Sequence, residues 1–496
     1  MCEAFFCPGP FCAFPLLLPA RGGYSWDMPS RVLLISANGC TTPDPVFPLG
    51  LAHLNAALRQ AGHEIVWLDV LAGAGRFAKA LRQFRPGFVG ISLRNIDDVL
   101  IRKQETFFND LASLSAVIRR ELNCPIILGG SGFSIFPERL LELAGADFGI
   151  AGEGESALPA LIEALEKGGD YQGIPGLVFR QGDRIIANSP APGCLERGLA
   201  DADRPGSVTA YYLQNGGMLN LQTQRGCAHR CCYCTYPLIE GRQHRRRPPE
   251  VVAAEFEQLQ RRGARYVFVV DSVFNSSARH VTEVCEALLE SGVKLPWGCF
   301  LRPQGLTSGL MRLMACAGLT HIEFGSDSFC DEVLAAYDKD LTFEDILRSS
   351  ELAREEKVDF CHFLIAGGPG ETMGTLERGF QNSLRLQGAV MMAVVGMRVY
   401  PGTPLFERAI AAGRIRRQSD LLAPVYFVEP GLTAEEIFAK LKEFSRRSPN
   451  WIPGDADPGY LKMVSRLRQR GVTGPLWSYF STIQRLWPQK SVLNGP

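Results

Sequence analysis

Arg225-Gly226-Cys227-Ala228-His229-Arg230-Cys231-Cys232-Tyr233-Cys234 is the most informative stretch of this 496-residue sequence. Cys227, Cys231 and Cys234 have C-x3-C-x2-C spacing. A cubane iron–sulfur cluster normally takes four thiolates, one for each iron. Three thiolates leave one iron open, and the amine and carboxylate of an amino acid can chelate that iron. We interpret these three cysteines as the ligands of a 4Fe-4S cluster.

A zinc site is the alternative interpretation of the same stretch, with His229 or Cys232 as a fourth ligand. Structural zinc sites usually take their ligands from two separated pairs, whereas all of these candidates lie in one short loop. This difference favours the cluster. Cys232 is then expected not to be a ligand, because three cysteines already suffice.

The residues around this stretch alternate between short apolar runs and helical spacing. The first run ends just before the cysteines, which places them in a loop at the carboxyl end of a strand. Six strand–helix units over residues 218–424 predict a partial barrel of the TIM type. The expected strands are Leu219–Thr223, Tyr266–Val270, Leu295–Phe300, His321–Phe324, Phe360–Ile365 and Ala393–Val399.

The region before the barrel, residues 29–187, shows the same alternation and predicts an α/β, doubly wound (Rossmann-like) domain with a parallel sheet. Ligands of such sheets bind at the carboxyl ends of the strands. The expected strands are Val32–Ile35, Ile65–Leu68, Phe88–Ser92 and Pro125–Leu128.

Three further segments complete the expected organisation. Residues 1–28 are expected to be a disordered or spurious extension, with Met28 as the true start, and the Pro- and Gly-rich residues 188–217 are expected to be a linker. Residues 425–496 predict a small helical region, with helices over 434–444 and 458–470. Its tryptophans, Trp451, Trp477 and Trp487, would cap a substrate cavity or cover the open side of the barrel.

Composition excludes several classes of protein. The chain has 52 basic and 52 acidic residues, so its charge gives no reason to expect a nucleic-acid partner. The most apolar run, residues 389–397, is far shorter than the ~20 residues that span a bilayer. The 15 cysteines are spread over a long chain without a secretory signal, so we expect a reducing cytoplasm.

The strand ends of the predicted barrel carry polar and glycine-rich motifs. Examples are the runs at 269–275, 322–328, 367–372 and 398–404. In this order behind a three-cysteine loop, they resemble the radical S-adenosylmethionine (SAM) enzymes that carry an N-terminal cobalamin (B12)-binding domain. The resemblance covers residues 31 to 430. It implies that SAM is bound by Glu323, Asp271, Ser326 and Arg398. The basic loop Arg242–Arg247 would hold an anionic group of SAM or substrate, or would be a solvated loop with paired arginines.

The N-terminal domain has four motifs at the spacing of such a cobalamin-binding domain, at residues 48–51, 90–95, 129–133 and 152–155. The resemblance places Ser92, Gly129 and Gly130 near the cobalamin. The histidine motif Asp-x-His-x-x-Gly of many cobalamin carriers is missing from the sequence. The cobalt would therefore have no protein ligand, or the domain would have lost cobalamin altogether.

The resemblance implies cleavage of SAM to a 5′-deoxyadenosyl radical and C-methylation of an unactivated carbon through methylcobalamin. The substrate would be a small molecule or lipid, because residues 234–242 resemble a lipid-biosynthesis subgroup. Peripheral membrane contact would then follow, and an electron donor such as a flavodoxin or ferredoxin is implied.

Three alternatives remain open. One is radical rearrangement, cyclisation or C–C coupling without methyl transfer. A tRNA methylthiotransferase would need a second cluster, for which Cys124 and Cys194 are poorly placed, and a C-terminal RNA-binding barrel. A zinc-stabilised interaction protein would contain zinc and no sulfide.

Overall fold

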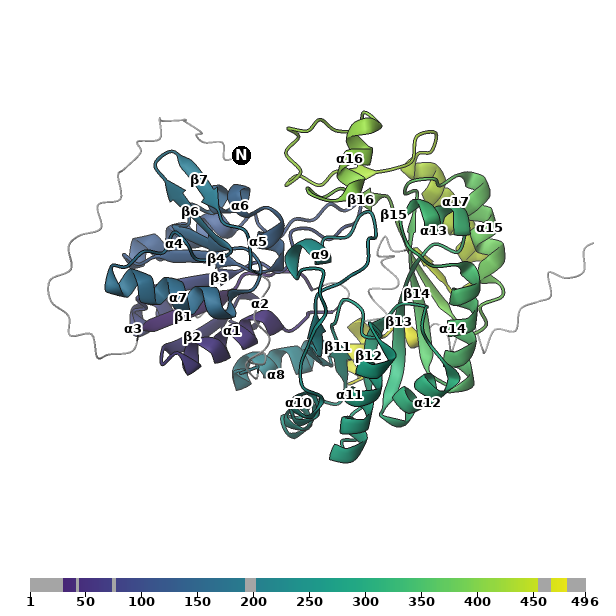
Figure 1. The fold of residues 1–496 in the computed structure, drawn as a ribbon, viewed down its shortest axis with the longest axis horizontal. Coiled ribbons are helices and arrows are strands. Elements are labelled where there is room, and N and C mark those ends of the chain that lie inside the picture. The colour runs from purple at the N-terminus through teal and green to yellow at the C-terminus, as the bar shows by residue number, and fades with distance from the viewer. Residues whose placement is uncertain (1–29, 42–43, 74–76, 192–201, 454–464, 480–496) are drawn as a thin grey trace, which may run out of the picture.

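A computed structural model of the chain describes residues 30–41, 44–73, 77–191, 202–453 and 465–479. The expected extension at residues 1–28, Trp487 and most of the expected helix at 458–470 lie outside the described residues. Two seven-stranded sheets, each with its own helices, lie side by side, and a short helix, α9 (Tyr236–Ile239), lies between them (Figure 1).

The N-terminal sheet has the order β2-β1-β3-β4-β5-β6-β7. β1 to β5 are parallel, and β6 and β7 extend the sheet antiparallel to β5. The four expected strands are all present, whereas β5, β6 and β7 were not expected. The strands are β1 (Arg31–Ser36), β2 (Glu64–Asp69), β3 (Phe88–Ser92), β4 (Ile126–Gly129), β5 (Phe148–Ile150), β6 (Leu177–Gln181) and β7 (Arg184–Ala187).

Both faces of this sheet are covered, because successive residues of a buried parallel strand point to opposite faces. In β1, Val32 and Leu34 belong to one core, and Leu33 and Ile35 belong to the other. This confirms the doubly wound architecture. The helices are α1 (Leu49–Gln60) and α7 (Gly154–Lys167) on one face, α3 (Phe77–Phe84), α4 (Leu111–Glu121) and α6 (Pro137–Ala144) on the other, and the short α2 (Val70–Gly73) and α5 (Ser131–Ile135).

Part of the expected linker is packed structure. Residues Gly206–Asn215 form helix α8. Its Tyr212 is buried against Phe47, and its hydroxyl donates to Asp69 Oδ2 at 2.9 Å. This portion of 188–217 therefore joins the core of the N-terminal domain, because its aromatic face outweighs the turn-forming residues around it.

The second sheet has the order β18-β15-β14-β13-β12-β11-β8, and all its neighbouring strands are parallel. Its two end strands are not bonded to each other in the described structure, so this is the expected partial barrel. All six expected strands are present. The strands are β8 (Leu219–Leu221), β11 (Val267–Val269), β12 (Trp297–Leu301), β13 (Leu319–Asp327), β14 (Asp359–Ala366), β15 (Val390–Val395) and β18 (Trp451–Pro453).

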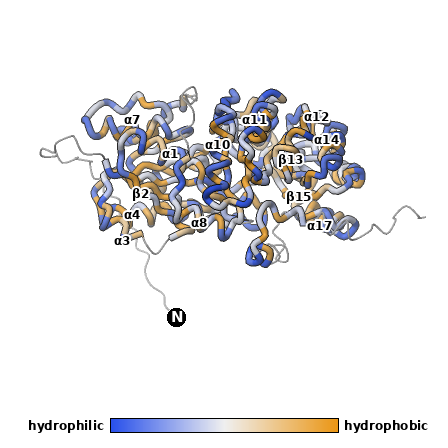
Figure 2. Tube along the Cα trace, turned by 90° about the horizontal axis from the view of Figure 1, so that it is seen from below, coloured by the Kyte–Doolittle hydropathy of each residue, from blue (hydrophilic) through white to orange (hydrophobic). Residues whose placement is uncertain are grey.

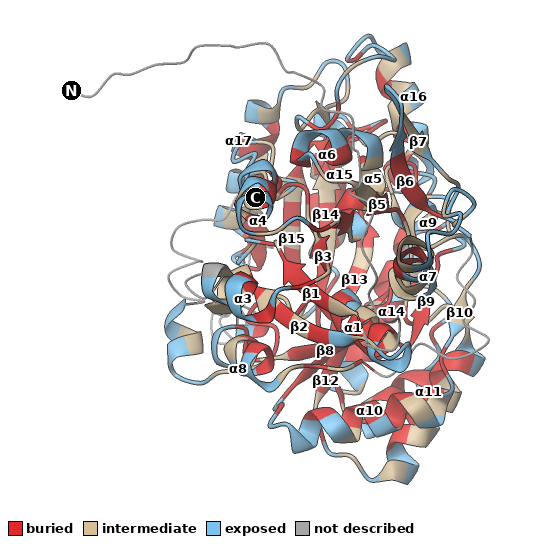
Figure 3. Cartoon of the chain, turned by 90° about the vertical axis from the view of Figure 1, so that its left-hand side faces the viewer, coloured by how far each residue is buried: buried red, intermediate tan, exposed pale blue. Residues whose placement is uncertain are grey.

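Helices cover the outer face of this sheet, and hydrophobic colour follows β13 and β15 while α14 and α17 carry hydrophilic residues outward (Figure 2). The same strands form the buried centre in Figure 3. No helix within the described ranges is long and apolar enough to cross a membrane. The outer helices are α10 (Pro249–Arg261), α11 (Ala278–Ser291), α12 (Ser308–Cys316), α13 (Asp331–Ala336), α14 (Phe343–Glu355) and α15 (Met373–Ser383). Helix α16 (Pro404–Ala411) lies at one end of the sheet, and its Leu405 and Ala409 pack in the same core as residues of the N-terminal domain (Figure 1).

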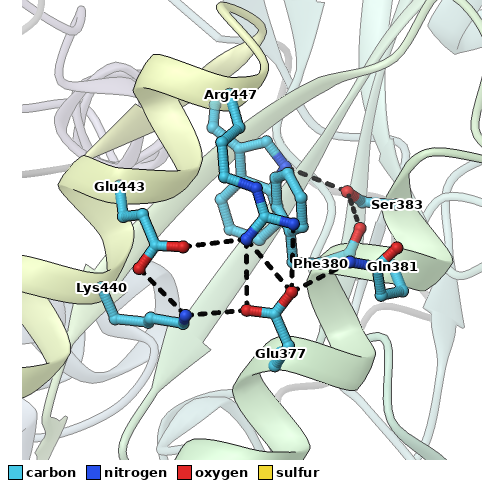
Figure 4. Close-up of polar contacts among 8 residues, drawn as sticks. Glu377, Phe380, Gln381, Ser383, Lys440, Glu443 and Arg447 are labelled. Atoms are coloured by element: carbon cyan, nitrogen blue, oxygen red, sulfur yellow. Dashed lines mark hydrogen bonds and ion pairs between the residues drawn. The ribbon is translucent and has the colours of Figure 1, made fainter. Parts of the chain in front are cut away.

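The C-terminal region is helical where helices were expected and described, residues 465–469 included, and it adds one strand that was not expected. Helix α17 (Ala434–Arg447) is present, but the residues from Trp451 form β18 at the edge of the sheet. Figure 4 shows how α17 is fixed to α15. Glu377 accepts from Lys440 at 2.8 Å and from Arg447 at 3.1 Å. Phe380 stacks on Phe444 with 4.4 Å between ring centroids, and the Arg447 guanidinium lies over the Phe380 ring.

Candidate functional site

A cavity of about 470 Å³ lies between the two domains. The four expected cobalamin-domain motifs all contribute to its wall, although they are far apart in the sequence. They meet because each follows or faces the carboxyl end of a parallel strand. The opposite wall comes from the second domain and consists of Asn220, Gln222, Arg225, Thr235, Tyr236, Ile239, Glu240, Val270 and Tyr400.

Ser92, Gly129 and Gly130, which the resemblance places near cobalamin, lie in this wall. Ser92 ends β3 and is in register with Gly129 at the end of β4. Gly130 then turns the chain into α5 with φ +101°, and a Cβ there would lie 2.5 Å from the carbonyl oxygen of Leu93. Glycine is required at this turn, which brings bare backbone to the cavity.

Arg94 supplies a cationic group to the same wall. Its Nε is buried and has no hydrogen-bond partner among the described residues. Burial lowers the pKa of the guanidinium. An open buried donor requires an acceptor, and cobalamin offers amide and phosphate oxygens, so this wall fits the cofactor. His53 of α1, which also lines the cavity, is fully buried.

The three-cysteine loop begins just after the short strand β9 (Gln224–Arg225), which pairs with β10 (Arg245–Arg246). Gly226 has φ +93°, and the Cys227 amide donates to the Gly241 carbonyl at 3.0 Å. Cys227 is buried, whereas Cys231 and Cys234 are partly exposed. Burial raises the pKa of Cys234 to about 12, so metal binding at this thiol would release a proton.

Cys232 lies on the other side of the loop. Its side chain is fully buried, with the sulfur 4.0 Å from that of Met397. Its backbone is held by Tyr337 and Leu405. Cys232 therefore packs in the core, away from the three predicted cluster ligands.

The geometry of the loop also bears on the zinc alternative. No three His, Cys, Asp or Glu side chains of the described residues converge on a point that could hold one metal ion. Zinc needs its ligands about 2.0–2.3 Å from a single centre. A cubane needs no such point, because each thiolate binds its own iron. In the described structure the three thiols are thus not arranged around a single metal ion.

Asp327 is a residue of this site that the sequence analysis did not single out. It ends β13, next to the cluster loop, with φ +64°, a conformation that non-glycine residues rarely adopt. Its Oδ2 accepts from the Tyr233 hydroxyl at 2.6 Å and from Lys339 at 2.8 Å. Asp327 thus ties the cluster loop to the fourth barrel strand. Its position at the end of β13 is the feature that could have identified Asp327 as a site residue.

Glu323 and Asp271 were expected to contact SAM. Glu323 accepts from Trp477 Nε1 at 2.9 Å, and burial raises its pKa to about 7. Asp271 is fully buried and accepts from the amides of Thr223 and Gln224, at 2.7 and 3.2 Å. Burial raises its pKa to about 7 as well. Asp271 therefore holds the segment that leads into the cluster loop.

Ser326 and Arg398 are committed to other contacts. The Ser326 hydroxyl is fully buried and bonds to His362 at 2.7 Å. Arg398 Nε donates to Asp97 of the N-terminal domain at 2.9 Å, and its other nitrogens donate to backbone carbonyls. These bonds fix the position of both side chains, and their expected contact with SAM stays a prediction.

At Arg245 and Arg247 the basic loop follows the second of its two interpretations. Arg245 bonds to Glu153 of the N-terminal domain, and Arg247 pairs with Glu255 at 2.5 Å. These arginines neutralise nearby acids, but Arg247 is buried rather than solvated.

Comparison with known proteins agrees with this geometry. The B12 binding domain family matches residues 35–162, and the radical SAM superfamily matches residues 221–380. The tryptophan 2-C-methyltransferase of Streptomyces laurentii is 25% identical over 429 residues, with 72% of this chain and 71% of that protein covered. The hopanoid C-3 methylase of Methylococcus capsulatus is 26% identical, with 66% of this chain and 64% of that protein covered.

The fold is also that of a solved structure. The radical S-adenosylmethionine methyltransferase TsrM from Kitasatospora setae has a TM-score of 0.82 and 24% identity, with 92% of this chain and 98% of that chain covered. A radical SAM domain implies a 4Fe-4S cluster and SAM, and a B12-binding domain implies cobalamin. The chain is therefore a radical SAM enzyme with an N-terminal B12-binding domain.

Proposed function

We propose that this enzyme transfers a methyl group from SAM to a carbon atom of a small-molecule substrate. One observation carries the proposal. The wall of the cavity combines the B12-domain motifs with Thr235 and Tyr236, which directly follow Cys234. The expected cluster loop therefore adjoins the cavity that the cobalamin-domain motifs line. The relatives that are named methyltransferases or methylases support the same reaction.

The bound cofactors would supply one-electron cleavage of a sulfonium and a carrier for the methyl group. The chain's own residues hold and shield them. Cys227, Cys231 and Cys234 would bind the cluster, with Asp271 and Asp327 fixing the segments on either side of the loop. An electron donor such as a flavodoxin or ferredoxin would reduce the cluster.

The substrate class is open within this proposal. One relative acts on tryptophan and another on a hopanoid by their names, so the comparisons do not favour a lipid. The lipid role and peripheral membrane contact therefore stay predictions. The methylthiotransferase alternative loses support, because Cys124 is buried in the N-terminal core, while Cys194 lies outside the described residues.

Anaerobic reconstitution with iron, sulfide, cobalamin and SAM tests the proposal. We expect S-adenosylhomocysteine among the SAM products, and a gain of about 14 Da per methyl in a true substrate. 5′-Deoxyadenosine without S-adenosylhomocysteine would support rearrangement or cyclisation instead. The control is the triple variant with Cys227, Cys231 and Cys234 replaced by alanine. Cleavage of SAM by this variant would refute the cluster assignment.

A further inference from the structure

Two carboxylates of the N-terminal domain reach across the domain boundary to the cluster loop. Arg225 Nη2 lies 2.6 Å from Glu155 Oε1, and Arg225 Nη1 lies 3.2 Å from Glu153 Oε2. Arg245 bonds to Glu153 from the neighbouring strand. Only 7% of the Arg225 side chain is exposed, so this is a buried cluster of two arginines and two carboxylates.

On the cluster side, the backbone between Arg225 and Cys227, the first expected iron ligand, is short and held by hydrogen bonds. Arg225 stands two residues before Cys227 and is paired across the β9–β10 ladder with Arg245. Gly226 lies between Arg225 and Cys227. Its amide donates to Glu240 Oε2 at 3.0 Å, and its carbonyl accepts from the Ser272 hydroxyl at 3.0 Å. A shift of Arg225 would therefore be passed on to Cys227.

On the cobalamin side, Glu153 and Glu155 flank Gly154, where α7 begins. Both carboxylates line the 470 Å³ cavity together with Gly129 and Gly130. Burial alone would raise the pKa of Glu155, but Arg225 outweighs burial and holds the value at about 2. The carboxylate that faces Arg225 is thus charged at any working pH.

We propose that Arg225 is a positioning residue that sets the placement of the cluster loop against the cobalamin-binding wall. The proposal rests on the proposed function, because it assumes that cluster and cobalamin serve one reaction in this cavity. Arg225 is suited to this role since its planar guanidinium can bind two carboxylates in fixed directions at once, which a lysine cannot do. Neither Glu153 nor Glu155 needs to touch a cofactor for this role.

Pulsed EPR of the loaded enzyme provides a direct test, because reduced cluster and cob(II)alamin are both paramagnetic. The measured quantity is the distribution of distances between them in the wild type, Arg225→Gln, Arg225→Lys and Glu155→Gln. We expect a shifted or broadened distribution for Arg225→Gln, and smaller changes in the same direction for the two milder variants. If Arg225→Gln fails to fold, these two variants carry the test, and wild-type distributions in both would overturn the proposal.

The matched control is Arg468→Gln. Arg468 also makes a buried ion pair between the domains, at 2.6 Å from Asp44, with 7% of its side chain exposed. Its hydrogen bonds go to Asp44, Val472 and Gly474 and not to the cluster loop, so we expect the variant to lower stability without changing the distance distribution. An equal change in this control would show that any weakening of the domain interface has the effect, and it would overturn the special role of Arg225.

Methyl transfer gives a second readout. Misplacement of reacting groups by about 1 Å can cost about 100-fold in rate, so Arg225→Gln should transfer methyl groups about 10- to 100-fold more slowly at unchanged iron and cobalamin content. The two proposals fail differently. If the wild type forms no methylated product, the proposed function is refuted. The distances between cluster and cobalamin can still be measured in that case, and they test the positioning role of Arg225.

Discussion

Replacing Glu323 with glutamine should make the stability of the second domain less dependent on pH. Glu323 lies on β13 and accepts a hydrogen bond from Trp477 Nε1 at 2.9 Å. Burial raises its pKa from 4.5 to about 7. Because the pKa is higher in the folded than in the unfolded chain, the contribution of Glu323 to stability is fully present below pH 4.5. It is lost as the pH rises through about 7.

The size of the effect follows from this change in pKa. Each pKa unit corresponds to about 1.4 kcal/mol, so ionisation of Glu323 should cost the folded state about 3 kcal/mol by pH 8. Glutamine has nearly the same shape, can still accept from Trp477, and does not ionise. Glu323→Gln should therefore gain about 2.5 kcal/mol on the wild type between pH 5 and pH 8, because the unfolded carboxyl is already mostly ionised at pH 5. This corresponds to about 5–10 °C in Tm for a domain of this size.

Differential scanning calorimetry at pH 5 and pH 8 measures this difference. Asp271 and Glu371 also have pKa values raised to about 7 by burial, but they are the same in both proteins and cancel in the comparison. Glu344→Gln is the control, because it removes a carboxyl whose side chain is 78% exposed. We expect parallel pH profiles for this control and the wild type.

A second variant tests the cause. Trp477→Phe keeps an aromatic ring against Cys361 and Val390 but removes the hydrogen bond that lowers the pKa of Glu323. The pH at which stability falls should then move upward. Parallel profiles for Glu323→Gln and the wild type, together with no shift in Trp477→Phe, would refute a buried protonated carboxyl at this position.

Two further predictions concern the domain boundary and the cavity wall. Asp44→Asn should lower the free energy of unfolding by about 3 kcal/mol, because it leaves Arg468 buried without its charge partner. Denaturant titration measures this loss. A loss below about 1 kcal/mol would contradict the prediction, since that is the value of an exposed ion pair. Gly130→Ala should weaken cobalamin binding about tenfold in absorbance titrations, since the new Cβ would lie 2.5 Å from the Leu93 carbonyl oxygen. Gly129→Ala is its control because the nearest atom is 3.6 Å away, and equal effects of both variants would refute the steric argument.

The strand pattern of both domains could be predicted because buried parallel strands are continuous apolar runs between helices. The missed elements lack that signature. β18 has three residues and includes Pro453, which is tolerated at the edge of a sheet. β6 and β7 (Leu177–Gln181 and Arg184–Ala187) are short and antiparallel. No helix separates them, so they lack the strand–helix–strand pattern by which parallel strands are recognised.

The candidate site was predictable where local sequence determines it. The spacing of the three cysteines and the glycine at position 130 are local properties. The place of Ser326 was accessible too, since strand alternation puts it on the same face as the buried Ile322 and Phe324, toward the helices. The role of Arg398 was not accessible, because its partner Asp97 is 301 residues away in the chain.

The chain carries 52 basic and 52 acidic residues. Some of these charges are buried as ion pairs where the two domains meet. Among the described residues, several buried ion pairs join the two domains. Asp97 pairs with Arg398, Asp44 pairs with Arg468, and Glu153 and Glu155 pair with Arg225. Buried ion pairs contribute little net stability, because desolvation offsets their attraction, but a mispaired or shifted partner is costly. Their effect is therefore to permit one relative placement of the domains and to penalise others. A reaction that needs two cofactors from different domains in one cavity requires such a fixed placement, which an apolar interface alone would specify less strictly.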